Sequence, residues 1–169
     1  MYFLSPLHGT NNKLTSASIN HLVGFTTAQL HAALITPFFV EFTQRVLVEG
    51  YRLGPSMKYI LASTSMSNLP HHTNIIYIQY DMDTSSLTST IHVFTHPKWR
   101  PWGNRLSAAC PKCSSPHSWS DVVKQGSTYT YNCRRYGCPG SCSFPKPEGF
   151  ELSNIEVNGG RWMRKEYMV

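Results

Sequence analysis

The sequence has little charge, no long apolar run and no cysteine before Cys110. Asp, Glu, Lys and Arg make up only 14 % of its 169 residues, against about 25 % in an average soluble domain. No window approaches the roughly 18 consecutive apolar residues that a membrane-spanning helix needs. The start Met1–Pro6 lacks the basic flank and apolar core of a secretion signal. These absences argue against an acidic disordered tail, a membrane protein and a secreted protein, so we expect an intracellular protein, nuclear or cytoplasmic.

Basic charge and cysteine are both concentrated in the last part of the chain. Residues 1–97 carry four basic and four acidic side chains, whereas residues 98–169 carry eleven basic and five acidic ones and hold the entire formal charge of +6. All five cysteines fall between Cys110 and Cys142. Two prolines and a glycine within 97–103 break regular structure there. We therefore expect an α/β segment over 1–97 and a basic lobe over 98–169.

The first segment predicts two to three helices and three to four short strands. Its apolar residues predict one short helix ending at Gly24 and a second helical stretch, broken or kinked at Pro37, ending near residue 50. Three runs rich in β-forming residues follow. They are Lys58–Ala62, Ile75–Tyr80 and Thr88–Thr95. The pattern predicts an α+β fold in which this part precedes a small β lobe.

Cysteine spacing predicts a metal site in the second segment. Two residues separate the first pair of cysteines, which lets both thiolates point inward from one tight turn, and a second pair after a predicted strand over 128–132 would complete a tetrahedron around one structural zinc ion. The expected ligands are Cys110, Cys113, Cys133 and Cys138. Because four residues, not two, separate the second pair, Cys142 could replace Cys138, and His117 could replace one thiolate. This arrangement is similar to a zinc ribbon.

Cations and aromatic residues recur together through the basic lobe. Cations neutralise phosphates, and flat rings stack on unpaired bases. The candidate nucleic-acid-binding residues are Lys112, Tyr129, Tyr131, Arg134, Arg135, Arg161, Arg164 and Lys165. We therefore expect a zinc-stabilised binding module that contacts DNA or RNA. An alternative stays open, in which the α/β part binds a protein partner and the zinc only stabilises the lobe.

Motifs spread over nearly the whole chain resemble a set of uncharacterised proteins from mushroom-forming fungi. The resemblance implies an α/β part followed by a zinc ribbon, a longer stretch before His8 and no established activity. The motifs that carry it are His8-Gly9-Thr10, Ser18-Ile19, Phe25-Thr26, Leu30, Ala32-Ala33-Leu34, Thr36-Pro37-Phe38-Phe39, Phe42-Thr43, Arg100-Pro101-Trp102-Gly103, Cys110-Pro111-Lys112-Cys113 and Gly160-Arg161-Trp162-Met163.

A more distant similarity concerns His8-Gly9 and a predicted strand that ends at Ser63, 55 residues after His8. This order resembles caspase-like and CHAT peptidases, in which a His-Gly turn and a cysteine at a strand end form a catalytic dyad. The cysteine is missing here, and a serine needs stronger activation than a thiol. The similarity implies a degenerate hydrolase scaffold, so we assign no catalytic residue and keep His8 and Ser63 as the pair to examine.

Overall fold

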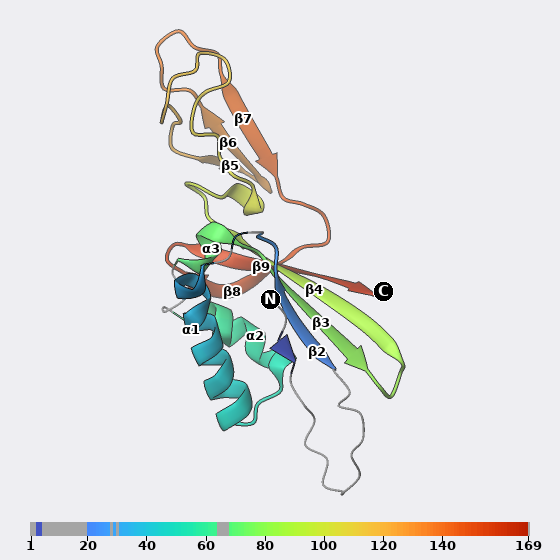
Figure 1. Ribbon diagram of the computed structural model, residues 1–169. Coiled ribbons are helices and arrows are strands. Elements are labelled where there is room, and N and C mark those ends of the chain that lie inside the picture. The colour runs from blue at the N-terminus through green and yellow to red at the C-terminus, as the bar shows by residue number, and fades with distance from the viewer. Residues whose placement is uncertain (1–2, 5–19, 28, 30, 64–67, 169) are drawn as a thin grey trace, which may run out of the picture.

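The computed structural model describes residues 3–4, 20–27, 29, 31–63 and 68–168. They form two antiparallel β-sheets and a layer of helices, an α+β fold (Figure 1). The large sheet has the strand order β1-β2-β3-β4-β9-β8. Its strands are β1 Phe3–Leu4, β2 His21–Phe25, β3 Ile75–Asp81, β4 Ser86–Thr95, β8 Glu151–Val157 and β9 Gly160–Met168. The small sheet, in the order β5-β6-β7, consists of β5 Val123–Gln125, β6 Thr128–Asn132 and β7 Ser141–Pro145.

Helices cover one face of the large sheet. They are α1 Ala32–Phe42, which continues into the π-helical turn η1 Thr43–Val48, then α2 Leu53–Ala62 and α3 Leu69–His72. The helix α1 continues through Pro37, where we expected a break or kink. The prediction of a strand over Lys58–Ala62 is wrong, because these residues form the second half of α2. Buried Leu53, Met57 and Ile60 follow the helical period and outweigh the local β preference of this run.

The prediction of a helix ending at Gly24 is also wrong for its described part, since His21–Phe25 is strand β2. It pairs with β3 from His21↔Gln79 to Phe25↔Ile75. Val23 faces the core and is 3 % exposed, whereas its sequence neighbours are only half-buried. The pairing with β3, about 50 residues later in the chain, selects the strand here, and the local sequence does not reveal it.

The main core lies between the helices and the large sheet. Phe38 of α1 is completely buried, with its ring centroid 5.5 Å from that of Phe25 and 5.6 Å from that of Phe39. On the sheet side, the indole of Trp162 in β9 packs edge-on against Phe94 and donates a 2.8 Å hydrogen bond to the carbonyl of Leu61. The last strand is thus locked to the second helix of the chain.

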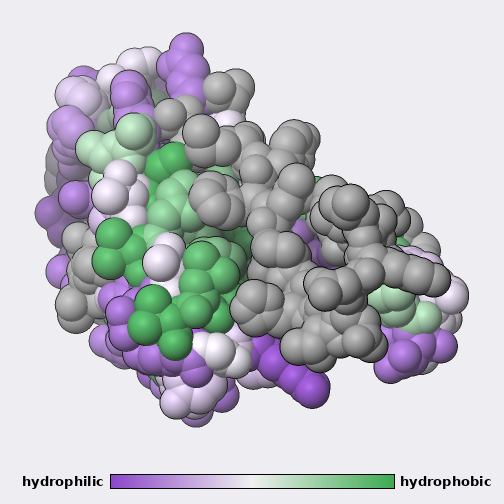
Figure 2. Space-filling view, turned by 60° about the horizontal axis from the view of Figure 1, so that its bottom comes forward, coloured by the Kyte–Doolittle hydropathy of each residue, from purple (hydrophilic) through white to green (hydrophobic). Residues whose placement is uncertain are grey.

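The outer surface of the helices carries apolar side chains. Figure 2 shows them gathered on the left of the view, the side on which the helices lie in Figure 1. The exposed ones on α1, η1, the following loop and α2 include Val40, Leu47, Val48, Tyr51 and Tyr59. Among the described residues, no helix has the length and hydropathy to cross a membrane.

The small sheet packs on the large sheet through a second, smaller core. Val93 of β4 and Met163 of β9 meet Trp102, Tyr129 and Tyr131 there. The Trp102 and Tyr129 rings stack with centroids 4.7 Å apart. The short 3-10 turn Pro101–Gly103 brings the indole into place.

Gly103 permits the close approach of this turn to β4. It has φ +82°, and a Cβ atom there would lie 2.2 Å from Cγ1 of Val93. Both the positive φ and this contact exclude a side chain.

The basic segment 98–169 contributes strands to both sheets. The final strand β9 pairs with β4 over eight residues, from Thr88↔Met168 to Thr95↔Arg161. The expected boundary near residue 97 therefore marks where the chain leaves the large sheet, and the chain returns to that sheet at β8. The cysteine-bearing part projects from the large sheet between these two points (Figure 1).

Candidate metal centre

Four cysteine side chains converge at the end of the small sheet that lies farthest from the large sheet. The Sγ atoms of Cys110, Cys113, Cys133 and Cys138 all lie within 4.8 Å of one another. The Cys110–Cys138 and Cys113–Cys133 sulfur distances are 3.9 Å and 3.7 Å. A tetrahedral zinc ion with Zn–S bonds of about 2.3 Å requires sulfurs about 3.8 Å apart, whereas a disulfide needs about 2.05 Å. The four thiols therefore have the spacing of a metal site.

The first cysteine loop, residues 110–115, is a tight turn. The amide of Ser114 donates to the carbonyl of Cys110 at 2.8 Å, and the amide of Cys110 donates to the carbonyl of Ser115 at 3.0 Å. Ser114 has φ +55°, the left-handed conformation that reverses the chain. These backbone bonds point the thiols of Cys110 and Cys113 to the same side.

The second cysteine loop, residues 133–140, begins directly after β6. The amide of Cys133 donates to the carbonyl of Gly140 at 2.7 Å, which closes the loop. Inside it, the amide of Cys138 donates to the carbonyl of Arg135 at 3.0 Å, and Gly137 has φ +71°. The extra residues between the two cysteines form this turn. The longer spacing is therefore compatible with four convergent ligands.

Neighbouring donors act on the sulfur atoms. Hydrogen bonds from the Ser118 hydroxyl and the Arg135 amide lower the pKa of Cys133 to about 6. The Gly140 amide, 3.4 Å from the sulfur of Cys138, lowers the pKa of that thiol, but desolvation and the three neighbouring cysteines raise it to about 12. Without a cation the cluster thus resists ionising fully. A divalent ion among the sulfurs removes this mutual repulsion.

The two alternative ligands lie outside the converging group. Cys142 is opposite Tyr131 in the small sheet and packs against the smaller core, where burial and the nearby Cys110 raise the pKa of its thiol. His117 is exposed, has φ +48° and donates its amide to the carbonyl of Ala108 at 2.9 Å. Among the described residues, the only grouping with metal-binding spacing is the four-cysteine one.

Gly140 is a residue of the centre that the sequence analysis missed. A Cβ atom at this position would lie 2.5 Å from Sγ of Cys110 and 3.3 Å from Sγ of Cys138. The sulfurs therefore need the bare backbone at this point. A glycine two residues after the last cysteine of a metal loop is the signal that would have found it.

Gly140→Ala should weaken metal binding at least tenfold, because the methyl group would displace the sulfur of Cys110 by a large part of a bond length. A chelator competition titration measures this loss. Gly137→Asn is the matched control, since nothing lies within 4 Å of a Cβ there and asparagine tolerates the positive φ. Equal affinity of Gly140→Ala and the native protein would contradict the close sulfur contact.

The structure corrects the role predicted for two tyrosines. Tyr129 and Tyr131 are 7 % and 1 % exposed, and the Tyr131 hydroxyl donates to the carbonyl of Pro97. Burial raises the pKa of Tyr131 well above its usual range. Residues two apart on a strand face the same side, and here that side is the smaller core. Neither ring is free to stack on a base.

Three of the predicted cations lie on β9 of the large sheet and not at the cysteine loops. Each has a partner from the segment that precedes β9. Arg161 lies 3.5 Å from Glu156, Arg164 lies 2.9 Å from Glu151, and Lys165 donates to the carbonyl of Glu148 at 3.2 Å.

Three other predicted cations gather on the cysteine loops, and all three are exposed. Lys112 belongs to the first loop, and Arg134 and Arg135 belong to the second. The Arg135 guanidinium donates to the carbonyl of Cys113 at 3.3 Å and ties the loops together. Tyr136 is 103 % exposed, so the second loop presents an uncovered aromatic ring beside two arginines. Tyr136 is not among the residues predicted from the sequence to bind nucleic acid.

Of the two residues that the peptidase similarity names, His8 and Ser63, the structure describes only Ser63. Ser63 follows helix α2 and not a strand, and its hydroxyl donates to Oε1 of Glu41 at 2.7 Å. His8, the other candidate, lies outside the described residues.

The fold and the site together define a class of protein. It is an α+β protein whose small antiparallel sheet ends in a four-cysteine centre with metal-binding geometry. No protein-family model, curated protein or solved structure matches the chain.

Proposed function

We propose that the four cysteines bind one structural zinc ion, and that the surface of the two cysteine loops binds single-stranded nucleic acid. The convergence of four thiols at tetrahedral spacing carries the first part of this proposal. Four sulfur ligands favour zinc or iron among the metals. A closed set of four protein ligands leaves no position for water or substrate, so the ion stabilises the lobe and performs no catalysis.

The charge and exposure of the cysteine loops support the second part. Residues 104–150 hold six basic and two acidic side chains. Lys112, Arg134 and Arg135 are exposed on the loops. The nearest acidic group, Asp121, is 3.5 Å from Arg134, and both side chains face solvent. An exposed ion pair contributes little free energy, so a phosphate group can replace Asp121 at low cost.

Tyr136 supports a single strand as the ligand. Its ring is completely exposed and is held at the tip of a metal-bound loop between Arg135 and Gly137. A duplex hides the faces of its bases, whereas a single strand offers them for stacking. Stacking on one aromatic ring contributes about 1–3 kcal/mol per base. The ring and the flanking cations thus suit a short unpaired segment of DNA or RNA.

Removing the two arginine charges should weaken binding and flatten its salt dependence. For Arg134→Gln with Arg135→Gln, the slope of log K against log salt should fall by about 1.4, at about 0.7 per phosphate contact with a single strand. Tyr136→Ala should weaken binding by about five- to 150-fold, the equivalent of the stacking energy. Fluorescence anisotropy with mixed-sequence single-stranded DNA and RNA measures both effects.

Arg161→Gln with Arg164→Gln is the matched control for this prediction. It removes the same net charge from β9 and should leave the affinity nearly unchanged. Equal effects of the two double variants would show that only net charge matters and would contradict a site on the loops. Metal content, measured for every variant, separates loss of binding from loss of the zinc.

A protein-binding adaptor is the second candidate function, and the exposed apolar surface of the helices favours it. Val40, Leu47, Val48 and Tyr51 lie close together in sequence and are each more than half exposed. Exposed apolar clusters of this kind often mark interaction surfaces. If neither DNA nor RNA binds saturably at low salt, that result would favour the adaptor function over nucleic-acid binding by the cysteine loops.

A further inference from the structure

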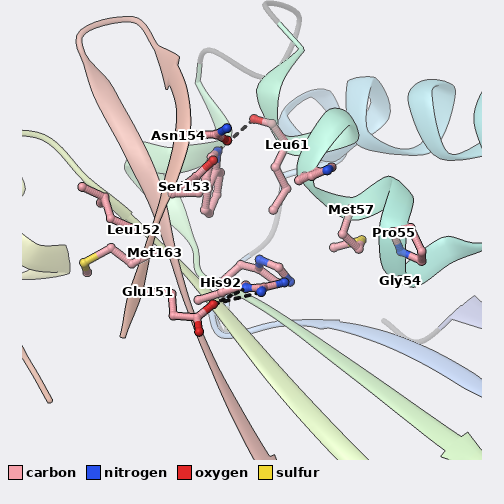
Figure 3. A pocket seen from close by; sticks show the side chains of 13 residues that line it. Gly54, Pro55, Met57, Leu61, His92, Glu151, Leu152, Ser153, Asn154 and Met163 are labelled. Carbon is pink, nitrogen blue, oxygen red and sulfur yellow. Dashed lines mark hydrogen bonds and ion pairs between the residues drawn. The ribbon is translucent and has the colours of Figure 1, made fainter. Parts of the chain in front are cut away.

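A pocket of about 360 Å³ lies between helix α2 and the edge of the large sheet (Figure 3). Met57 and Leu61 of α2 form one wall, His92 of β4 and Trp162 of β9 form the floor, and the start of β8 forms the opposite wall. This pocket belongs neither to the metal centre nor to the cysteine loops. Its volume falls at the small end of the range for small-molecule sites.

An irregularity in β8 opens the pocket. The pairing of β8 with β9 shifts register between Leu152 and Glu156, so Ser153 and Asn154 leave the regular ladder and line the pocket wall. Helix α2 covers the sheet as far as Trp162, which is 4 % exposed, whereas Arg164 two residues further along β9 is exposed. The uncovered part of the sheet face is the mouth of the pocket.

His92 is the most unusual group in the pocket. It is 8 % exposed, and its ring points into the cavity (Figure 3). The hydrogen bonds found within the described part of the chain include none to its ring nitrogens. Burial, and then the charge of Arg164, lower the pKa of His92 to about 4, so the imidazole is neutral at pH 7 and offers one donor and one acceptor. Because the ring faces the pocket, a ligand bound there can pair with this donor or acceptor.

Arg164 is the direct cross-strand neighbour of His92. Its Nε and Nη2 atoms both donate to Oε2 of Glu151, at 3.0 Å and 2.9 Å, which orients the guanidinium at the mouth of the pocket. Lys58 adds a second positive charge to the lining. Since Glu151 is the only acidic residue of the lining, the pocket carries a net positive charge.

The first turn of α2 faces the same space. Gly54 and Pro55 line the pocket, and no side chain caps the start of the helix at Arg52. The free amides of a helix start attract negative charge. Together with His92 and Arg164, this turn makes one end of the pocket suited to an anion, while Met57, Leu61 and Trp162 make the rest apolar.

We propose that this pocket binds a small organic carboxylate with an aromatic or branched apolar body. The carboxylate lies between the His92 ring and the Arg164 guanidinium, and the apolar body packs against Met57, Leu61 and Trp162. Glu151 positions Arg164 and does not contact the ligand. The site is independent of the metal and of nucleic acid.

Titration of the full, zinc-loaded chain with phenylacetate tests this proposal, with neutral phenylacetamide as the matched probe. Phenylacetate should bind saturably, with chemical-shift changes at His92 and Trp162 in NMR spectra. Phenylacetamide should bind at least tenfold more weakly, because it lacks the charge. Arg164→Gln should weaken phenylacetate binding at least tenfold, and His92→Phe should abolish the preference for the charged probe.

Arg161→Gln controls for loss of positive charge from the same strand, because Arg161 does not line the pocket. It should bind phenylacetate like the native protein. Arg164 is exposed, so its replacement should not unfold the chain, and the test does not depend on the buried histidine. Equal binding of the two probes, no binding of either at millimolar concentration, or unchanged binding by Arg164→Gln would overturn the proposal.

Discussion

Cys133→Ser is expected to release the metal and to unfold the small sheet, while the large sheet keeps its structure. A structural zinc site contributes roughly 10–16 kcal/mol of apparent binding free energy, and the loss of one thiolate removes several kcal/mol of it. The small sheet has three short strands and only a few buried residues. Its own packing interactions are therefore too few to keep the cysteine loops folded without the metal. Chelator competition gives the change in affinity, and amide NMR spectra of residues 105–145 report the unfolding.

Cys142→Ala is the control for this experiment. It removes a thiol from the same sheet, but one outside the converging group, so the metal should remain bound. The expected cost is about 1 kcal/mol of stability for the small change in packing. Metal loss in Cys142→Ala, or unchanged affinity in Cys133→Ser, would mean that the ligand set differs from the four cysteines.

Trp162→Ala should lower the free energy of unfolding by about 3–5 kcal/mol, the usual cost of removing a large buried aromatic side chain. The indole packs on Phe94 and donates to the carbonyl of Leu61, which lies 101 residues earlier in the chain. The variant therefore loosens the contact of β9 with the helix layer. Urea unfolding followed by circular dichroism measures the change, which is large for a domain of this size.

Tyr136→Ala provides the comparison, because its exposed ring should contribute less than about 0.5 kcal/mol to stability. The metal content of Trp162→Ala should equal that of the native protein. A loss below about 1 kcal/mol, or a loss confined to the cysteine loops, would show that the last strand does not belong to the main core.

Local signals in the sequence predict the cysteine site and the central hairpin. Cys110 and Cys113 lie in one turn, because a spacing of two residues lets both thiols point to the same side of a tight turn. The β-rich run Ile75–Tyr80 and the alternating run Thr88–Thr95 match β3 and β4, and the polar turn between them favours the reversal of the chain. The residues that form these features lie close in sequence, at most 28 positions apart in the cysteine site.

The features that depend on distant partners could not be predicted. The residues of Lys58–Ala62 suit a strand. The signal for helix α2 lies before this run, where Leu53 and Met57 are spaced about one helical turn apart. The return of β8 and β9 to the large sheet rests on pairing with β4, about 70 residues earlier. No local pattern encodes this return.

The alternation of Tyr129 and Tyr131 shows that these residues share one face of a strand, but not whether that face is covered. The structure shows that it packs on Val93 and Met163 from the large sheet. The exposed aromatic ring of the lobe is instead Tyr136, in a loop that has no periodicity. Whether an aromatic side chain is exposed therefore depends on which parts of the fold pack against it. Composition and residue spacing do not determine that packing.

X-ray absorption spectroscopy at the zinc edge, on protein purified under reducing conditions, tests the central claim most directly. The proposed four-cysteine site predicts one zinc ion per chain, with four sulfur atoms at about 2.3 Å and no lighter ligand. A nitrogen at about 2.0–2.1 Å would place a histidine such as His117 in the ligand set. That result, or protein without bound zinc, would contradict the four-cysteine centre.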